Sequence, residues 1–588
     1  MHTENQSATV EDIKVKKFLA LTLALCMLLV CFISCDDIYI DGDVSDSVDD
    51  DDKNENKDSN KDDKNNKDNK NESEDDNDKN SGIGGIIGDL IGGLIGSDKN
   101  DNDDNDNNNG TNGNNGNNGN NGNNGNNGNN GNNGNNGSNG GGITDESTYL
   151  PNVDFEGYNF RVLHADGTGY FSAIDDEDAD TTSILHQAEV ERDSEISDRF
   201  NIMIKDVWSD SYQITDFVIK DALNVSSSYD IGYLNRIENA CDILSMNLSQ
   251  DVKSMPMLDL TKEWYVQQAN EEFSIFGKQF FVSGAYPEKP SSPQFLFNKD
   301  FIRGKNMDLP YDLMLSGKWT IDRLMQYTTV GYSNFNSAYN GIDGLDKFGY
   351  AGHDRSACYF YQGFGGQTTY RTNDGSVKPV FASDTIDAMY YKVTEFYNHK
   401  ANWTNKSLDA GDPTSSHRVF YDGRAMFCYW ITATLNSYDI ETFEYGLGIL
   451  PMYSTYQGRY YCPASSGITL FPINLEDPYT TGYLYESLCE ASQRIVYPAS
   501  IQEAKDFQML TDEKSIEVQK LVDRSLSYDI LDYCDPSEGY LGSYGFIWEC
   551  IQNQVPPSIS AQSYEDAFNL LFDEFFDGVK DKIDQENG

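Results

Sequence analysis

The residues best suited to ligand chemistry in this sequence are aromatic side chains that stand beside glycine, serine or charged residues. An aromatic ring can stack on an apolar face of a ligand, while amide, carboxylate and backbone groups bond to its polar rim. Core packing is the commoner role of any single aromatic residue, but as a set we expect several to line a cleft for a neutral ligand. The predicted ligand-binding residues, seven aromatic and one amide, are Tyr233, Trp264, Tyr265, Tyr286, Asn298, Phe364, Trp430 and Trp548.

Polar candidates for the same cleft are weaker. Asn298 ends an apolar stretch and offers both a donor and an acceptor, so it could bond to a crossing chain or to a ligand hydroxyl. A surface or capping role is the simpler interpretation of four further residues, Asp230, Asn235, Glu238 and Arg424.

No motif predicts catalysis, a metal site or a cofactor. The six His are scattered, and HExxH, GxSxG and Walker A patterns are absent from the sequence. The acidic residues between 175 and 180 lack the spacing of an EF-hand, so a solvated loop is the simpler interpretation. A glycosidase needs only two suitably spaced carboxylates, and that alternative stays open in so acidic a chain.

The composition of the chain differs sharply between two of its parts. Its 588 residues carry 96 acids against 43 Lys and Arg, a net charge of −53. This charge excludes general nucleic-acid binding and argues against electrostatic adhesion to anionic membranes. Residues 36–143 hold 25 acids, eight Lys, no Trp, no Phe and only Tyr39. A segment without aromatic residues cannot bury enough apolar area to offset its entropy. We therefore expect 36–143 to be disordered and 144–588 to fold into at least two lobes.

The N-terminus predicts a signal peptide and a lipid anchor. Lys14, Lys16 and Lys17 precede an uncharged, mainly apolar run over 18–33 that ends in Ser34-Cys35. This ending resembles a bacterial lipobox, although Phe32 stands where an aliphatic residue is usual. The resemblance implies that residues 1–34 are removed and that Cys35 carries the lipid, for which two acyl chains give stable anchoring. An uncleaved membrane anchor is the alternative.

Residues 35–143 have the composition of an acidic, Asn-Gly-rich tether. Flexible coils of this length span on the order of 50–60 Å, enough to hold a folded part away from a membrane. One apolar stretch interrupts the tether between Gly82 and Gly96, with glycines at every fourth position. It is too short to span a bilayer. We interpret it as part of the linker, with a membrane-surface contact or self-association as the alternative.

Cysteine spacing argues against a zinc site and leaves the redox state of the thiols open. None of the cysteines after residue 143 forms a CxxC pair. Their number is odd, so at least one thiol must be free in an extracellular protein. They are Cys241, Cys358, Cys428, Cys462, Cys489, Cys534 and Cys550.

Strand and helix patterns alternate after residue 150. Strands are predicted over 158–163, 201–207 and 229–233, with helices over about 183–199 and 214–224. This order predicts right-handed βαβ units and a parallel sheet, with ligands at the carboxyl ends of its strands.

Three later segments of the sequence predict capping, turn or packing roles. Thr320 is a predicted N-cap, which makes Trp319 a packing residue. The residues over 423–426 predict a turn from helix to strand, and the apolar spacing over 564–575 predicts the packing face of a last helix.

From about residue 150 to 580 the sequence resembles extracellular solute-binding proteins of ABC importers, of the sugar-binding type (family 1). Any one of the matching segments is weak, but they occur in the expected order. They are AEVER at 188–192, FNI at 200–202, MLDLTKEW at 257–264, FGKQFFVSG at 276–284, FLFNK at 295–299, LPY at 309–311, GKWT at 317–320, FYDGRAM at 420–426 and GLGILP at 446–451.

The resemblance implies a two-lobed, periplasmic-binding-protein-like α/β fold (type II) that closes at a hinge. We expect the folded part, 144–588, to comprise a first lobe of about 150–297 with part of the C-terminal region, and a second of about 300–560. The implied function is a monomeric, lipid-anchored receptor on the extracellular face of the membrane, without enzymatic activity or cofactor. It captures a mono- or oligosaccharide for an ABC permease.

Three alternatives stay open at this point. A surface glycan-binding lipoprotein would retain polymer without transport, a lipid-anchored glycoside hydrolase would cleave it, and a degenerate receptor would sense or bind peptide.

Overall fold

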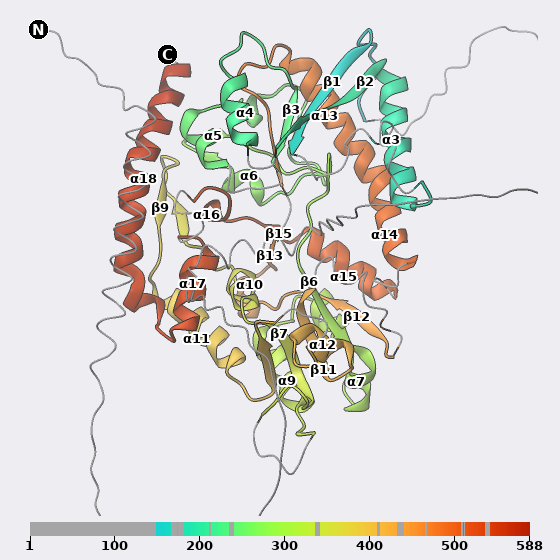
Figure 1. The fold of residues 1–588 in the computed structure, drawn as a ribbon, viewed down its shortest axis with the longest axis vertical. Coiled ribbons are helices and arrows are strands. Elements are labelled where there is room, and N and C mark those ends of the chain that lie inside the picture. The colour runs from blue at the N-terminus through green and yellow to red at the C-terminus, as the bar shows by residue number, and fades with distance from the viewer. Residues whose placement is uncertain are drawn as a thin grey trace, which may run out of the picture. The chain divides into compact units, whose positions relative to one another are not determined.

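The structure, a computed structural model, describes residues 149–165, 173, 181–210, 213–234, 240–335, 342–407, 412–431, 440, 442–464, 467–506, 510, 512–535 and 541–587. Two β-sheets, of four and five strands, organise these residues. Figure 1 shows the short strands β13 (Cys462–Pro463) and β15 (Leu526–Ser527) between the two sheets.

The first sheet is parallel except at one edge. In spatial order its strands are β2 (Ile202–Ser209), β1 (Tyr158–Ala165), β3 (Ile231–Leu234) and β14 (Ile468–Leu470). β1 pairs parallel with β2 and β3, as predicted, whereas β14 is antiparallel to β3. Phe160 and Val162 pack into one core and Leu163 and Ala165 into another, because successive strand residues point to opposite faces.

Helix α3 (Ile184–Phe200) confirms the first predicted helix and shows why it forms there. Ser183 is its N-cap and accepts a hydrogen bond from the backbone N–H of His186 at 3.1 Å. Asn201 ends it with a left-handed φ of 50°. Ile196 lies on its buried face, which packs against the first sheet together with the later helix α13.

The second sheet has five strands. In spatial order they are β10 (Asn402–Asn405), β7 (Phe348–His353), β11 (Ala425–Ile431), β6 (Gln294–Asn298) and β12 (Tyr445–Gly448). The first three are parallel, and β6 is antiparallel to both of its neighbours.

Helices that pack on the second sheet confirm two structural predictions. Thr320 caps α9 by accepting from the N–H of Arg323, and Trp319 is fully buried with its indole N–H donating to the Ile449 carbonyl at 3.0 Å. Gly423, with φ of 69°, turns the chain from helix to strand. The packing helices are α7 (Lys299–Gly304), α9 (Ile321–Gly331), α11 (Asp384–Tyr397) and α12 (Ser416–Tyr421).

The two sheets share one strand order. The first sheet has the order β2-β1-β3-β14, and the second begins with the equivalent order β10-β7-β11-β6. In both, the earliest parallel strand lies between the second and the third, and an antiparallel strand follows the third. The chain leaves the first sheet after β3 and enters the second sheet with its antiparallel strand β6. It leaves the second sheet after β12 and returns to the first sheet with its antiparallel strand β14. The fold class is therefore the predicted one, two α/β lobes in a type II periplasmic-binding-protein-like arrangement.

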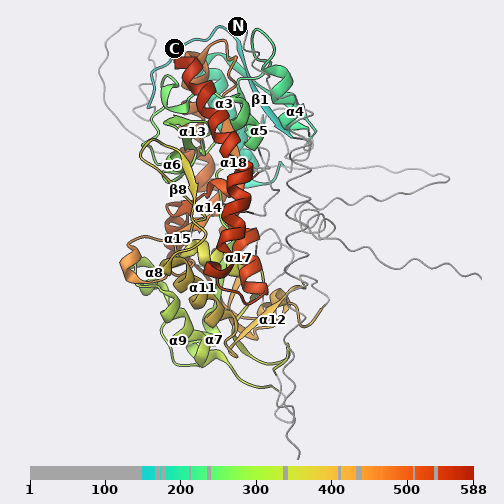
Figure 2. The same cartoon turned by 90° about the vertical axis from the view of Figure 1, so that its left-hand side faces the viewer.

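The last helix, α18 (Pro557–Asn587), contacts elements of both lobes. It packs on α5 beside the first sheet and on α11 and α17 beside the second, and Figure 2 shows it running along both groups. Its buried residues include Tyr564, Phe568 and Phe572, which confirms the predicted packing face.

Further elements connect these layers. The helices are α4 (Ile214–Asp221), α5 (Ala240–Met246), α6 (Ala269–Glu272), α8 (Tyr311–Leu315), α10 (Ser356–Gly363), α13 (Pro478–Ala491), α14 (Tyr497–Asp506), α15 (Glu513–Asp523), α16 (Ile530–Tyr533) and α17 (Ser543–Gln552). Two short 3₁₀ helices are η2 (Val252–Ser254) and η4 (Thr455–Gln457), and the π-helix η5 (Ser492–Val496) joins α13 to α14. The strands are β4 (Ser274–Ile275), β5 (Lys278–Gln279), β8 (Thr369–Arg371) and β9 (Val377–Pro379).

Several predictions concern residues outside those described. They are the signal peptide over 1–34, lipidation at Cys35, the tether over 35–143 with its Gly82–Gly96 stretch, and the acidic residues over 175–180. Within the described part of the chain, no helix has the length and apolar character needed to cross a membrane.

Candidate functional site

A pocket lies where the two lobes and the crossing strands β13 and β15 meet. The space between its atoms is about 290 Å³, part of which is open to solvent. Its lining residues are Gln268, Gln362, Gly365, Gly366, Gln367, Tyr461, Pro463, Ser527, Tyr528 and Asp529.

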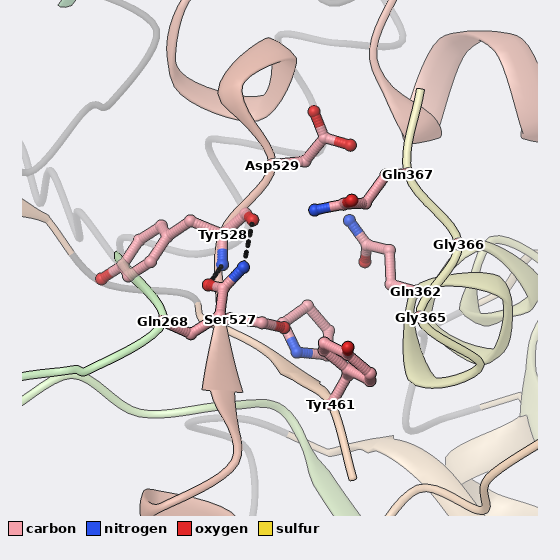
Figure 3. Close-up of a pocket in the computed structure, with 10 residues that line it drawn as sticks. Gln268, Gln362, Gly365, Gly366, Gln367, Tyr461, Ser527, Tyr528 and Asp529 are labelled. Carbon is pink, nitrogen blue, oxygen red and sulfur yellow. Dashed lines mark hydrogen bonds between the residues drawn. The ribbon is translucent and has the colours of Figure 1, made fainter. Parts of the chain in front are cut away.

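The wall of the pocket on the side of the first lobe is held by paired hydrogen bonds. The Gln268 side chain accepts from the backbone N–H of Tyr528 at 2.9 Å and donates to its carbonyl at 3.5 Å, as Figure 3 shows. The Tyr528 hydroxyl is 3.0 Å from the Ser283 hydroxyl. The neighbouring Val282 bridges to Thr469 of β14, so this wall is continuous with the first sheet.

The opposite wall begins at the end of α10. Phe360 of this helix contacts Tyr350 of β7 edge-on, with ring centroids 5.8 Å apart, which ties the wall to the second sheet. The turn after α10 needs glycine at 365, because its φ is 77° and a Cβ there would stand 2.9 Å from the Tyr461 ring. The Arg459 guanidinium carbon lies 4.3 Å from the centre of that ring.

Three amides and a carboxyl group supply the polar surface of the pocket. Figure 3 shows the amide ends of Gln362 and Gln367 turned towards the same space, with Asp529 beside them. Gln367 donates to Glu272 at 2.9 Å, and Gln362 donates to Asp532 at 2.9 Å. The Gln362 side-chain oxygen is buried and has no hydrogen-bond partner.

Burial perturbs the carboxyl groups behind this surface. It raises the pKa of Glu272 to about 7 and raises the pKa of Asp529 and of Asp532. Asp529 also caps α16, accepting from the Leu531 N–H at 3.1 Å, and accepts from the Thr368 N–H at 3.1 Å. These roles make Asp529 part of the scaffold as well as of the lining.

The chemistry of the pocket suits reversible binding. The Tyr461 ring provides a stacking surface and three amides provide donors and acceptors, and the lining residues include no paired nucleophile and base. Among the described residues, no group of three or more His, Cys, Asp and Glu side chains is arranged to hold a metal ion.

Five of the eight predicted ligand-binding residues lie in the interior. Tyr233, Tyr265, Tyr286 and Phe364 are each at most 3% exposed. Tyr265 donates to Glu486 at 2.5 Å, and Asn298 is the buried N-cap of α7. Phe364 is adjacent to the pocket in sequence, but its ring packs against Tyr453.

The other predicted residues are dispersed. Trp264 and Trp548 are partly buried, Trp264 edge-on to Tyr149 and Trp548 beneath the Arg355 guanidinium. The side chain of Trp430 and residues Asn235 and Glu238 lie outside the described part of the chain.

The two remaining weak candidates have local partners. Asp230 is buried and pairs with Arg161 at 2.8 Å. Arg424 pairs with Asp422 at 3.2 Å and bonds to the Pro413 carbonyl.

Sequence reasoning did not identify the lining of this pocket. Gln268, Gln362 and Gln367 are glutamines without a motif, and Tyr461 and Tyr528 are two among 37 Tyr. The one local signal was the pair Gly365-Gly366 directly after Phe364, since a tight glycine turn often marks close approach of backbone to another group.

No model of a known protein family and no curated protein matches the chain. Distantly similar solved structures include a cyclo/maltodextrin-binding protein complexed with maltotetraose (13% identity, TM-score 0.45, covering 71% of this chain and 97% of that one). Another is an ABC substrate-binding protein from Listeria monocytogenes in complex with cycloalternan (10%, 0.41, 70% and 98%). A third is an ABC transporter solute-binding protein from Agrobacterium radiobacter K84 in complex with ribitol (10%, 0.40, 71% and 100%). At these values the solute of this chain has to be inferred from its own residues.

Proposed function

We propose that this chain is a lipid-anchored extracellular receptor that captures a small solute, a mono- or oligosaccharide, and passes it to an ABC permease. One observation carries the proposal: the pocket is lined from both lobes and from both crossing strands. A solute held there contacts parts of the chain that belong to different sheets.

Such a pocket couples binding to lobe closure. A ligand that bonds to Gln268 on one side and to Gln362 and Gln367 on the other favours the conformation in which both walls are close. The Tyr461 ring suits an apolar face of a sugar, and the amides suit its hydroxyl rim. The permease would recognise the closed, loaded form, and no bond of the solute is made or broken.

The N-terminal sequence supports the location. Cys35 at the end of an apolar core, followed by a long acidic tether, fits a lipid anchor that leaves the receptor free to move near the membrane. The acidic surface charge fits a soluble monomer that has no nucleic-acid partner.

The carboxyl groups near the pocket argue against the glycosidase alternative. Asp529 is engaged as a helix cap, and Glu272 accepts from Gln367 and lies 3.5 Å from Arg371. Neither is free to act as nucleophile or base in the observed arrangement. A surface glycan-binding module would instead need an open aromatic platform, whereas this pocket is recessed between two walls.

Calorimetry and thermal-shift measurements on the full chain against mono- and disaccharides test the proposal. Tyr461→Ala should weaken binding of the best saccharide about tenfold, because it removes one stacking surface. Tyr456→Ala, which alters a side chain that is 99% exposed, is the matched control and should not change affinity. Small-angle scattering should show compaction with saccharide.

Two results would contradict the proposal. Release of reducing ends from an oligosaccharide would identify a hydrolase. Retention of insoluble glycan without binding of any mono- or oligosaccharide would identify a surface glycan-binding protein.

A further inference from the structure

A cluster of acidic side chains lies directly behind the polar wall of the pocket. It comprises Glu272 of α6, Asp529 and Asp532 at α16, and Asp535 in the segment that follows. Electrostatic interactions link all four. Arg371 is the cationic side chain that acts on Glu272 and Asp529, so the cluster carries more negative than positive groups.

Most oxygens of the cluster are used by the scaffold. Asp535 accepts from the N–H groups of Leu541 and Gly542 at 2.8 and 3.2 Å. Asp529 accepts from Thr368 and Leu531. The side chains of this group therefore hold the chain in place around the pocket.

Two acceptor atoms are left over beside the pocket. Gln362, which is 7% exposed, donates its amide N–H to one oxygen of Asp532 at 2.9 Å. Its own oxygen and the second oxygen of Asp532 are buried without a partner. Buried acceptors without donors are costly, and Gln362 is part of the pocket lining, so a donor supplied by a ligand would satisfy the site.

We infer that this pocket selects a solute carrying an ammonium group, of the amino-sugar class, with Asp532 and Gln362 as its partners. The inference rests on the proposed function and specifies its substrate class. An ammonium group has three donors and no acceptor, which matches unpaired acceptors in an acidic surrounding. A neutral hydroxyl has a single donor, so it would satisfy one of the two acceptors and leave the other without a partner.

Protonation of the cluster gives this selection a measurable signature. Burial raises the pKa of Glu272 to about 7 and of Asp532 well above its ordinary value, so the empty cluster holds protons near neutral pH. A bound cation favours the ionised carboxylates and releases those protons. Other titratable groups that face the cluster include Glu271, Tyr359, Tyr361, Tyr533, Tyr544, Cys358 and Cys534.

The test is isothermal calorimetry on the full chain with two matched disaccharides. β-1,4-linked glucosamine disaccharide and cellobiose differ in carrying amino groups or hydroxyls at the same positions. At pH 7 the amino disaccharide should bind at least tenfold more tightly. Comparison of two buffers with different ionisation enthalpies should show proton release for it alone, and its affinity should fall at least tenfold between pH 7 and pH 5.

Charge-removing variants separate the cluster from general effects. Asp532→Asn keeps the shape of the side chain but cannot ionise, and should weaken binding of the amino disaccharide about tenfold or more. It should also reduce proton release. Glu272→Gln should act in the same direction, which keeps the test valid if one variant folds poorly. Asp312→Asn, at a side chain that is 86% exposed, is the control and should change neither quantity.

The outcomes distinguish the inference from the proposed function. Equal or tighter binding of cellobiose, or binding without proton release, would overturn the charge selection and leave saccharide capture standing. Binding of putrescine in place of every saccharide would support selection of a cation and contradict the sugar class. Failure of both amino disaccharide and putrescine to bind would overturn the inference.

Discussion

Replacing Glu486 by glutamine should change how the stability of the first lobe depends on pH. Glu486 lies on α13 and is fully buried. One of its oxygens accepts from the Tyr265 hydroxyl at 2.5 Å and from the Asp259 N–H at 3.4 Å, and the other has no partner. Burial raises its pKa from an ordinary 4.5 to about 7.

The magnitude follows from this pKa. Since one pKa unit corresponds to about 1.4 kcal/mol, the difference between folded and unfolded chains is worth about 3 kcal/mol. The sign is set by the direction, because the folded state favours the neutral carboxylic acid. The contribution of Glu486 to stability is therefore complete below about pH 4.5 and is lost as the pH rises to about 7.

Glu486→Gln is neutral at every pH, so the comparison with the natural chain isolates this one group. The free energy of unfolding of the variant minus that of the natural chain should increase by about 3 kcal/mol between pH 4.5 and pH 8. Urea denaturation followed by tryptophan fluorescence, at constant ionic strength, measures it. Glu517→Gln, at an exposed position of α15, should show no such trend. A difference independent of pH at Glu486 would refute the reasoning.

Three further predictions concern packing, capping and thiols. Gly482→Ala should destabilise the chain by several kcal/mol, because its Cβ would stand 2.0 Å from the Pro256 carbonyl oxygen. Gly578→Ala, in a helix with open space around it, should instead stabilise the chain by about 0.5–1 kcal/mol. Equal changes of the two variants in a urea titration would contradict the packing argument. Asn298→Ala should lower the free energy of unfolding by about 1 kcal/mol, since Asn298 accepts from the Phe301 N–H at 2.8 Å. Asn298→Asp keeps this helix cap and should be as stable as the natural chain. A loss of saccharide affinity in both variants, measured by calorimetry, would show that Asn298 contacts the ligand. All seven cysteines after residue 143 are buried, so iodoacetamide should alkylate none of them in the native chain and all of them in urea. Mass spectrometry of peptides maps the labelled positions. Rapid labelling of any one cysteine under native conditions would contradict its burial.

Local signals in the sequence were sufficient for many elements. The helix beginning at Ser183 and ending before Asn201 follows from a capping residue, apolar residues at four-residue spacing and a residue that tolerates left-handed φ. The cap at Thr320 and the packing face of α18 follow in the same way. Each rests on hydrogen bonds or periodicity within one short stretch, so neighbouring residues already contain the information.

The lining of the pocket is not encoded in neighbouring residues in this way. Gln268, Gln362, Tyr461 and Tyr528 come from four separate stretches of the chain. Nothing local separates a Tyr that lines a pocket from Tyr265, which donates to a buried carboxylate 221 positions away. The side chains predicted to bind ligand were chosen for their chemistry, and that chemistry serves a core equally well.

By itself, the sequence determined that the later part of the chain is α/β and which of its short stretches are helix or strand, because capping residues and apolar periodicity act locally. Only the tertiary structure decided that β6 and β14 each cross to the other lobe and pair antiparallel there, and that β13 and β15 pass between the lobes. Long-range strand pairing of this kind depends on which distant edges are left unpaired once the local elements have formed. The position of the pocket follows from that pairing, since the same crossings bring its walls together.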